Sequence, residues 1–375
     1  MNIAFPVSPR SWRYHNPVAI HVGPGTLARL PALVGNRQAV LLTFAEAPAL
    51  GLSQRLGELL GSNLLATLSD IQPNPDITAI AALYDRLWRD YPDADCIIAL
   101  GGGSCIDSAK SMLGGTPSGT FAEWRAHLAQ GAPAPTGRRR RLIAIPTTSG
   151  TGSEVTPWAT IWDRARGRKY SLHQPWTWPE AAIIDPELMR SLPRETTLIG
   201  GLDALSHAME SIWNINRNPV SGCLAVQAAR AIIRTLPALL QDLENPALRA
   251  AMAGAALEAG LAFSNTKTAL AHSLSYDITL NHNVPHGIAC SFSLPHIMKL
   301  ALGRDAETDA RLLAIFHADD AAQAIDILER YLASLGVSTN PNDYGITAAA
   351  WPTMLRDALR GPRGRNFINA TPITD

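Results

Sequence analysis

The first half of the chain alternates short apolar runs with segments of helical periodicity. The apolar runs end at glycine, proline or polar residues, which is the pattern of buried strands. Residues from 26 onward, 50–60 and 76–89 instead repeat apolar positions every three or four residues, which predicts helices. Strands separated by helices predict a mostly parallel sheet with helices on both faces. The predicted strands are residues 18–22, 39–44, 63–68, 96–100, 142–145 and 181–185.

The pattern changes after residue 154. Residues 159–162 and 169–172 flank a charged turn and predict a hairpin. The last strand signal closes at Asp185, and from Glu187 onward the pattern is helical with short breaks. We therefore expect an α/β domain over residues 1–185 and an all-helical domain over residues 186–375.

Composition narrows the class of protein. The 375 residues carry 32 basic and 32 acidic side chains, and 46% are hydrophobic. Zero net charge argues against nucleic acid or a membrane surface as the partner. Residues 1–6 lack the basic start and long apolar run of a signal peptide, and no run of about 20 apolar residues predicts a membrane span. The four cysteines form no Cys-x-x-Cys motif, so we expect reduced, mostly buried thiols and a cytoplasmic location.

Two loops of the α/β half follow apolar strands and carry the strongest chemical signal. In the first, a strand meets Gly101, Gly102, Gly103 and Ser104 and then a helix, so main-chain amides can approach an anion closely. The second, residues 145–154, is dense in glycines and hydroxyls suited to ribose, pyrophosphate or an amide. Ligands of open α/β sheets bind at such strand ends, so the two loops together predict a dinucleotide site.

Four residues of the helical half could hold a metal ion. Asp203 and His207 are four residues apart on a mostly apolar helical segment, so their side chains share one face. His272 and His286 follow later. One carboxylate and three imidazoles suit Fe²⁺ or Zn²⁺, but each histidine taken alone is more often an ordinary core or surface residue. Spacing alone leaves both interpretations open.

These motifs together resemble the iron-containing (group III) alcohol dehydrogenase family. In that family a dinucleotide-binding domain faces a helical domain that holds one metal, usually Fe²⁺ and sometimes Zn²⁺. The resemblance implies an NAD(P)H-dependent aldehyde or alcohol oxidoreductase, and a homodimer. By motif, the metal ligands would be Asp203, His207, His272 and His286. The Gly101–Ser104 loop would take the cofactor pyrophosphate, with Asp107, Thr147, Thr148 and Ser153 nearby. The matching motifs are residues 101–107, 146–154, 169–171, 184–186, 201–210 and 285–287.

Two positions depart from the family pattern. Many relatives have a second histidine four residues after the third ligand, where this chain has Tyr276; its phenol could donate a hydrogen bond to the reacting oxygen, or the proton could pass through His282 or water. Many NAD-preferring relatives place an aspartate after the first sheet strand, where this chain has Phe44. Without that carboxylate a 2′-phosphate is not repelled, so NADPH is allowed as well as NADH.

The run from Thr266 to Thr279 resembles the branch of the family that reduces phosphonoacetaldehyde to 2-hydroxyethylphosphonate. Lys267, five residues before His272, could supply a cation for the phosphonate, or could be an exposed lysine at a helix start. A bound divalent ion would polarise the carbonyl and stabilise the developing alkoxide during hydride transfer. A broad alcohol dehydrogenase or a maleylacetate reductase would share every motif. A lyase resembling dehydroquinate synthase is a further alternative, but Asp203 as first ligand and the sparse basic residues near His272 argue against it.

Overall fold

The computed structural model describes residues 11–370, which form two compact units. One unit comprises Pro17–Thr148 and Ser153–Met189. The other comprises Ser149–Gly152, the described residues before Pro17, and those from Arg190 onward. Residues 1–6, in which the sequence predicts no signal peptide, and the last five residues of the tail lie outside the described residues. The functional division at residues 185 and 186 stays a prediction.

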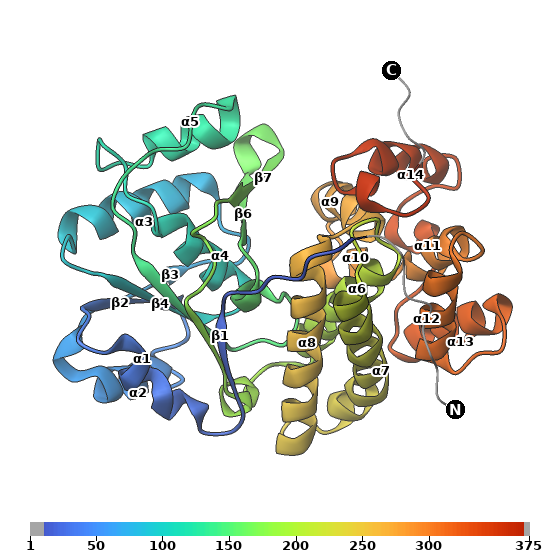
Figure 1. The fold of residues 1–375 in the computed structure, drawn as a ribbon, viewed down its shortest axis with the longest axis horizontal. Coiled ribbons are helices and arrows are strands. Elements are labelled where there is room, and N and C mark those ends of the chain that lie inside the picture. Colours follow the sequence, from blue (N-terminus) through green and yellow to red (C-terminus); the bar gives the residue numbers. More distant parts are fainter. Residues whose placement is uncertain (1–10, 371–375) are drawn as a thin grey trace. The chain divides into compact units, whose positions relative to one another are not determined.

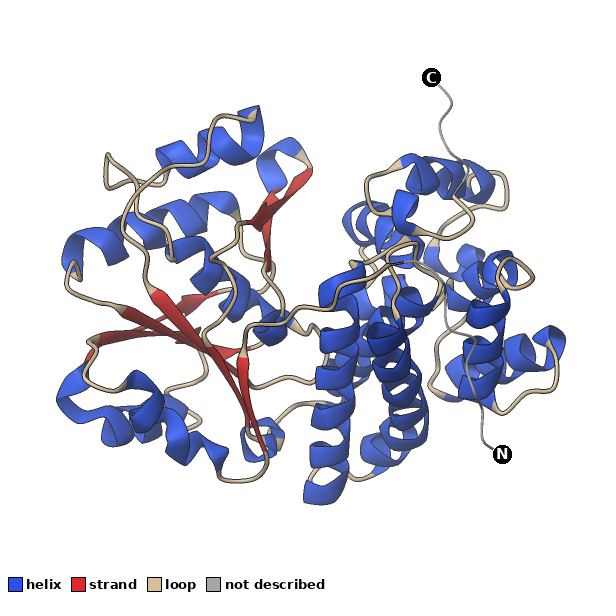
Figure 2. Cartoon of the chain, in the orientation of Figure 1, coloured by secondary structure: helices blue, strands red, loops and turns tan. Residues whose placement is uncertain are grey.

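The first unit is built on a six-stranded parallel sheet in the order β1-β8-β5-β4-β2-β3 (Figures 1 and 2). The parallel sheet and the helices around it confirm the predicted fold class of this half. The central strands are mostly apolar because both faces are covered. The strands are β1 (Ala19–Val22), β2 (Ala39–Phe44), β3 (Leu64–Ile71), β4 (Cys96–Gly101), β5 (Arg141–Pro146) and β8 (Ala181–Ile184).

Successive residues of each strand point to opposite faces of this sheet and build two separate cores. Leu41 and Ile98 belong to the core beneath α1 and α2, whereas Val40 and Ile97 belong to the core beneath α3, α4 and α5. Figure 1 shows these two helix layers on either side of the sheet. The helices are α1 (Leu30–Val34), α2 (Leu52–Leu60), α3 (Ile77–Asp90), α4 (Gly103–Met112) and α5 (Ala122–Gln130), with short 3₁₀ turns η1 (Thr26–Arg29), η2 (Gly61–Asn63), η3 (Ser153–Val155), η4 (Arg164–Arg166) and η5 (Pro186–Met189).

The hairpin expected from the sequence is present as a separate two-stranded sheet. β6 (Trp158–Asp163) pairs antiparallel with β7 (Arg168–His173), and Trp158 lies opposite His173. Ala159, Ile161 and Leu172 of the hairpin join the core beneath α3 and α4. The hairpin therefore extends the layer that covers one face of the sheet.

The second unit is helical, as predicted, and α6 runs through its interior. Every residue of α6 from Gly201 to Ile212 is buried, because α7, α8 and α10 all pack against it. A side chain at Gly201 would lie 2.7 Å from Leu236 of α7, so glycine permits the close approach. The helices are α6 (Arg194–Ile212), α7 (Pro219–Gln241), α8 (Pro246–Thr266), α9 (Leu270–His282), α10 (His286–Ser291), α11 (Leu294–Ala301), α12 (Ala306–Phe316), α13 (Ala321–Ser334) and α14 (Trp351–Arg360), with 3₁₀ turns η6 (Pro341–Tyr344) and η7 (Gly364–Asn366).

One helix of the described chain, α7, is long and apolar enough to cross a membrane, which the sequence analysis did not anticipate. Its most apolar 18-residue window has a mean hydropathy of 1.4, and 56% of that window is buried. Core helices of soluble proteins meet the same criterion, so the finding is weak evidence for a span.

Candidate metal centre and cofactor loops

Three helices bring the four predicted metal ligands of the helical unit to one point. Asp203 and His207 project from the same face of α6, His272 from α9, and His286 from the first residue of α10. Asp203 Oδ1 lies 4.0 Å from Nε2 of His207, 3.3 Å from Nε2 of His272 and 3.9 Å from Nε2 of His286. One carboxylate oxygen is therefore common to three imidazoles.

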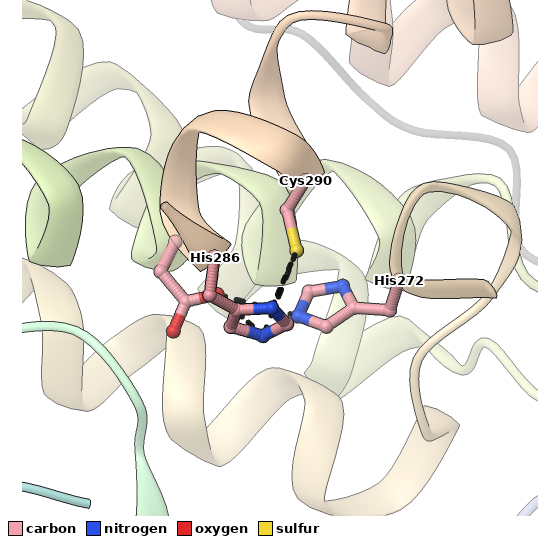
Figure 3. A group of neighbouring side chains, drawn as sticks. His272, His286 and Cys290 are labelled. Atoms are coloured by element: carbon pink, nitrogen blue, oxygen red, sulfur yellow. Dashed lines mark hydrogen bonds and ion pairs between the residues drawn. The ribbon is translucent and has the colours of Figure 1, made fainter. Parts of the chain in front are cut away.

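The same group contains a sulfur atom that the sequence analysis did not select. Donor atoms of Asp203, His272, His286 and Cys290 all lie within 4.8 Å of one another. Figure 3 shows the sulfur of Cys290 facing the imidazoles of His272 and His286. Cys290 is one helical turn beyond His286, so the signal in the sequence was a cysteine four residues after a candidate ligand.

Two buried atoms of this group have no hydrogen-bond partner. Asp203 Oδ1 and His272 Nε2 face each other at 3.3 Å without forming a hydrogen bond of acceptable geometry. Buried polar atoms are nearly always paired, and an isolated carboxylate is costly to bury. A divalent cation would satisfy both atoms, and carboxylate and imidazole donors suit Fe²⁺ or Zn²⁺. The donor set thus fits a transition metal.

Glu210 orients His272 from the side away from Asp203. Its fully buried carboxylate accepts hydrogen bonds from Nδ1 of His272 at 2.7 Å, from the His272 amide at 3.1 Å and from the Ala269 amide at 2.9 Å. When His272 is neutral, a proton held on Nδ1 leaves the lone pair of Nε2 directed at Asp203. Glu210 was missed in the sequence, although it lies two turns after Asp203 on the same face of α6.

Burial and the neighbouring charged groups together determine the charges of the cluster. Burial lowers the pKa of His207 to about 4, so this imidazole is neutral at pH 7. Burial opposes ionisation of Asp203, but the neighbouring imidazoles, His207 first, hold its pKa well below the usual range. Burial also opposes charge on His272, but Cys290, Glu210 and Asp203 raise its pKa. The cluster thus combines an ionised carboxylate with at least one neutral imidazole.

Aromatic stacking fixes the ring of His207. Its imidazole stacks between Phe263 of α8, with ring centroids 4.0 Å apart, and His272, with centroids 4.4 Å apart. The ring planes differ by 11° and 22°. The two histidines therefore lie face to face with both Nε2 atoms near Asp203.

The sequence also selected Tyr276, Lys267 and His282 as possible substrate or proton-transfer residues of the helical unit. Tyr276 is one turn beyond His272 on α9, and the Arg363 guanidinium carbon lies 4.7 Å from the centre of its ring. Burial raises the pKa of Tyr276 to about 12, so its phenol keeps its proton at neutral pH. Lys267 caps the C-terminus of α8 with a φ of 65° and is exposed. His282 ends α9, about 15 Å along the helix axis from His272.

The first loop predicted to bind a cofactor joins β4 to α4, as the sequence predicts. Gly102 precedes the helix, and no side chain of the described residues caps the N-terminus of α4. A side chain at Gly101 would lie 2.4 Å from Cys105 and 3.3 Å from Phe44, and one at Gly102 would lie 3.2 Å from Thr148. Ser104 accepts a hydrogen bond from the Asn74 amide, and Gly103 begins the helix. The loop is thus a narrow cradle of main chain with Phe44 and Thr148 beside it.

The second loop predicted to bind a cofactor is linked to α4 by hydrogen bonds between buried polar groups. The Ser153 hydroxyl donates to Asp107 and accepts from Lys110. Asp107 also accepts from the Thr160 amide, and the Thr147 amide donates to the carbonyl of Gly101. Burial raises the pKa of Asp107 and lowers that of Lys110 to about 8. In this structure, therefore, Asp107 and Ser153 hold the two loops together.

Comparison with known proteins assigns the class. The family model for iron-containing alcohol dehydrogenase matches residues 17–186, and the model for the C-terminal part of the Fe-containing alcohol dehydrogenase family matches residues 197–373. The chain therefore belongs to the iron-containing alcohol dehydrogenase family, which confirms the resemblance and makes it an alcohol or aldehyde oxidoreductase.

Individual relatives are similar to this chain over different shares of its length. NAD-dependent methanol dehydrogenase of Bacillus methanolicus is 31% identical over 324 residues, covering 84% of this chain and 83% of the relative. Phosphonoacetaldehyde reductase of Streptomyces viridochromogenes is 35% identical over 228 residues, covering 60% of this chain and 57% of the relative. The crystal structure of sulfoacetaldehyde reductase from Bifidobacterium kashiwanohense with NAD⁺ has a TM-score of 0.87 and 27% identity, covering 97% of this chain and 96% of that one.

Proposed function

We propose that this protein is a metal-dependent NAD(P)H aldehyde reductase that acts on a small anionic aldehyde, with phosphonoacetaldehyde as its substrate and 2-hydroxyethylphosphonate as its product. Residues 1–185 would bind the dinucleotide, and residues 186–375 would hold the metal and the substrate. The observation that supports an anionic substrate is the position of the Arg363 guanidinium over the ring of Tyr276, which lies one turn beyond His272.

Asp203, His207, His272 and His286 would hold one divalent metal, Fe²⁺ or Zn²⁺. The unpartnered Asp203 Oδ1 and His272 Nε2 support this ligand set. A divalent ion bound there would act as a Lewis acid that polarises the aldehyde carbonyl and stabilises negative charge on its oxygen. Glu210 keeps the His272 imidazole in the orientation and tautomer that such binding needs.

The dinucleotide pyrophosphate would bind at Gly101, Gly102, Gly103 and Ser104. The uncapped N-terminus of α4 supports this position, because free amides and the helix dipole favour a phosphate. Phe44 at the end of β2 would lie at the adenosine end of the cofactor, with no carboxylate of its own to repel a 2′-phosphate. Thr147 and Thr148 would bind beyond the pyrophosphate, and Asp107 and Ser153 would hold this loop in place.

Tyr276 would donate its phenolic proton to the carbonyl oxygen that becomes the alcohol, and would take up a replacement proton from water. Its pKa of about 12 keeps it protonated for this role. Arg363 would pair with the phosphonate: among the described residues, no carboxylate lies within ion-pair distance of its guanidinium. A fork of guanidinium N–H groups matches phosphonate oxygens well.

Lys267 is the alternative cation, and His282 the alternative proton carrier. Lys267 is exposed at the end of α8, and its carbonyl accepts a hydrogen bond from Asn214. His282 is separated from His272 by most of the length of α9. Arg363 and Tyr276 are therefore favoured for the two roles.

The test is steady-state reduction of phosphonoacetaldehyde, sulfoacetaldehyde, propanal and maleylacetate, each with NADH and with NADPH. Phosphonoacetaldehyde should have the highest kcat/KM. Arg363→Gln should lower that value about 10- to 100-fold, because a charged hydrogen bond contributes about 1.5–3 kcal/mol, and should leave propanal reduction nearly unchanged. The neighbouring exposed Arg365 provides the matched control, since Arg365→Gln should change neither substrate.

Each competing function predicts a different outcome. Equal or faster reduction of propanal would indicate a broad alcohol dehydrogenase, and preference for maleylacetate a maleylacetate reductase. A Lys267→Gln effect in place of the Arg363→Gln effect would move the phosphonate contact to Lys267. A lyase would give product without net loss of NAD(P)H absorbance, and that result would reject the reductase altogether.

A further inference from the structure

Cys290 differs from the other cysteines of the chain in what surrounds its sulfur. Cys96 and Cys105 are buried within the α/β unit, and Cys223 is exposed on α7. Cys290 is fully buried in the helical unit, and its Sγ lies 3.7 Å from Nε2 and 3.9 Å from Nδ1 of His286. Its sulfur therefore belongs to the donor cluster, and the other three do not.

The backbone of α10 fixes this position. His286 begins the helix and Cys290 follows four residues later, so the helix presents an imidazole and a thiol on one face. The same end of α10 packs tightly on α6: a side chain at Gly287 would lie 2.0 Å from the carbonyl oxygen of Ile199. The α10 backbone between His286 and Cys290 is therefore held close against α6.

Distances within the cluster suit one ion. Metal bonds of about 2.0–2.3 Å keep any two ligands of one ion within about 4.6 Å. The donor atoms of Asp203, His272, His286 and Cys290 lie within 4.8 Å of one another, so a shift of a few tenths of an ångström suffices. The unpartnered Asp203 Oδ1 and His272 Nε2 indicate independently that a cation belongs at this point.

We propose that Cys290 is a metal ligand, which completes a set with Asp203, His272 and His286 and adds a sulfur donor to the four residues of the proposed function. The inference rests on the metal site of that proposed function. When the ion binds, the S–H bond breaks, a bond from Sγ to the metal forms, and the proton leaves to solvent without any change of oxidation state. Sulfur ligation favours Zn²⁺ and Co²⁺ over the oxygen-preferring Mg²⁺ and Mn²⁺.

Cobalt substitution tests the ligand directly. The purified full-length protein is stripped of metal and loaded with Co²⁺, and its absorbance spectrum is recorded. Wild type should show visible d–d bands and a near-ultraviolet thiolate-to-cobalt charge-transfer band. Cys290→Ser should keep the visible bands and lose the near-ultraviolet band, whereas Cys223→Ser, the exposed control, should keep both.

Zinc X-ray absorption of the wild-type protein makes the same test without a variant, in case Cys290→Ser does not fold. One sulfur at about 2.3 Å is expected among nitrogen and oxygen ligands at about 2.0–2.2 Å. A spectrum with nitrogen and oxygen alone, or a charge-transfer band that survives in Cys290→Ser, would overturn the role of Cys290 and leave the proposed metal site intact. Failure of wild type to bind Co²⁺ or Zn²⁺ at all would overturn the metal site itself.

Discussion

Replacing Glu210 by glutamine changes the metal site without touching any proposed ligand atom. The carboxylate accepts three hydrogen bonds, from the amides of Ala269 and His272 and from Nδ1 of His272, and it offers no donor. Glutamine has nearly the same shape but only one oxygen. Its NH₂ group must therefore face at least one buried N–H, whichever way the amide turns.

The size of the effect follows from these contacts. The best orientation keeps the oxygen on Nδ1 of His272 and the Ala269 amide, and leaves the His272 amide facing NH₂. One unsatisfied buried donor costs about 1–3 kcal/mol of folding stability. The bond to Nδ1 also loses its charge assistance, and loss of such an outer partner weakens metal binding about 10- to 100-fold. That corresponds to about 1.4–2.8 kcal/mol of binding free energy.

The assay is competition for Zn²⁺ between the metal-free protein and a chromophoric chelator. Glu307→Gln is the matched control: this carboxylate is also buried in the helical unit, where it pairs with Arg311 at 2.8 Å and stands outside the metal cluster. Glu307→Gln should lower the Tm but keep the zinc affinity, whereas Glu210→Gln should lower both. Equal zinc affinities of wild type and Glu210→Gln would refute the orienting role of Glu210.

Two further changes test the α/β unit. Gly101 has a φ of 152°, and an added methyl group would lie 2.4 Å from Cys105. Gly101→Ala should therefore raise the Kd for NADH by at least about 10-fold in a fluorescence titration. Gly119 has a φ of 74° and open space around it, so Gly119→Ala should leave that Kd unchanged. Burial raises the pKa of Glu154 from 4.5 to about 7. Between these two pH values the unfolded chain has lost a proton that the folded protein keeps. Rising pH therefore lowers the free energy of unfolding, by about 3 kcal/mol in total. Glu154→Gln should therefore lose less unfolding free energy than wild type between pH 5 and pH 8 in urea titrations; parallel pH profiles would contradict this.

The sheet could be predicted from the sequence because its strands are buried on both faces. A run such as residues 96–100 has no polar residue to mark an exposed side, and Gly101 ends it sharply. The prediction was less accurate at the sheet edge. β3 runs from Leu64 to Ile71 rather than over residues 63–68, because an edge strand with exposed positions has weaker apolar boundaries.

The candidate ligands could be selected in the sequence because two of them share one helix. The four-residue spacing of Asp203 and His207 is a local signal, and helix geometry alone places both on one face. Glu210 continues that face but is read locally as an ordinary helix residue. Its role depends on the amides of Ala269 and His272 and on Nδ1 of His272, which lie 59 or more positions later in the sequence.

Arg363 could not have been found from its neighbourhood in the sequence, because it belongs to none of the motifs that indicated a cofactor or metal site. The contact with Tyr276 arises because α14 and the segment after it pack against α9 and the residues just before it. Ser273 donates to the carbonyl of Ala358, and Asn366 donates to the carbonyl of Thr268. These hydrogen bonds join residues 85 and 98 positions apart, and no periodicity or motif encodes such pairings.

The interior position of α6 links the stability of the helical unit to metal binding. Asp203 is 4% exposed, and a buried carboxylate is costly unless an opposite charge compensates it. The nearby His207 is neutral at pH 7, because burial lowers its pKa to about 4. His207 therefore gives Asp203 no compensating charge at that pH. A divalent cation at Asp203 Oδ1 would supply one, and a ligand that binds only the folded state stabilises it by mass action. We therefore expect the helical unit to be more stable with a divalent cation bound at Asp203 than without one.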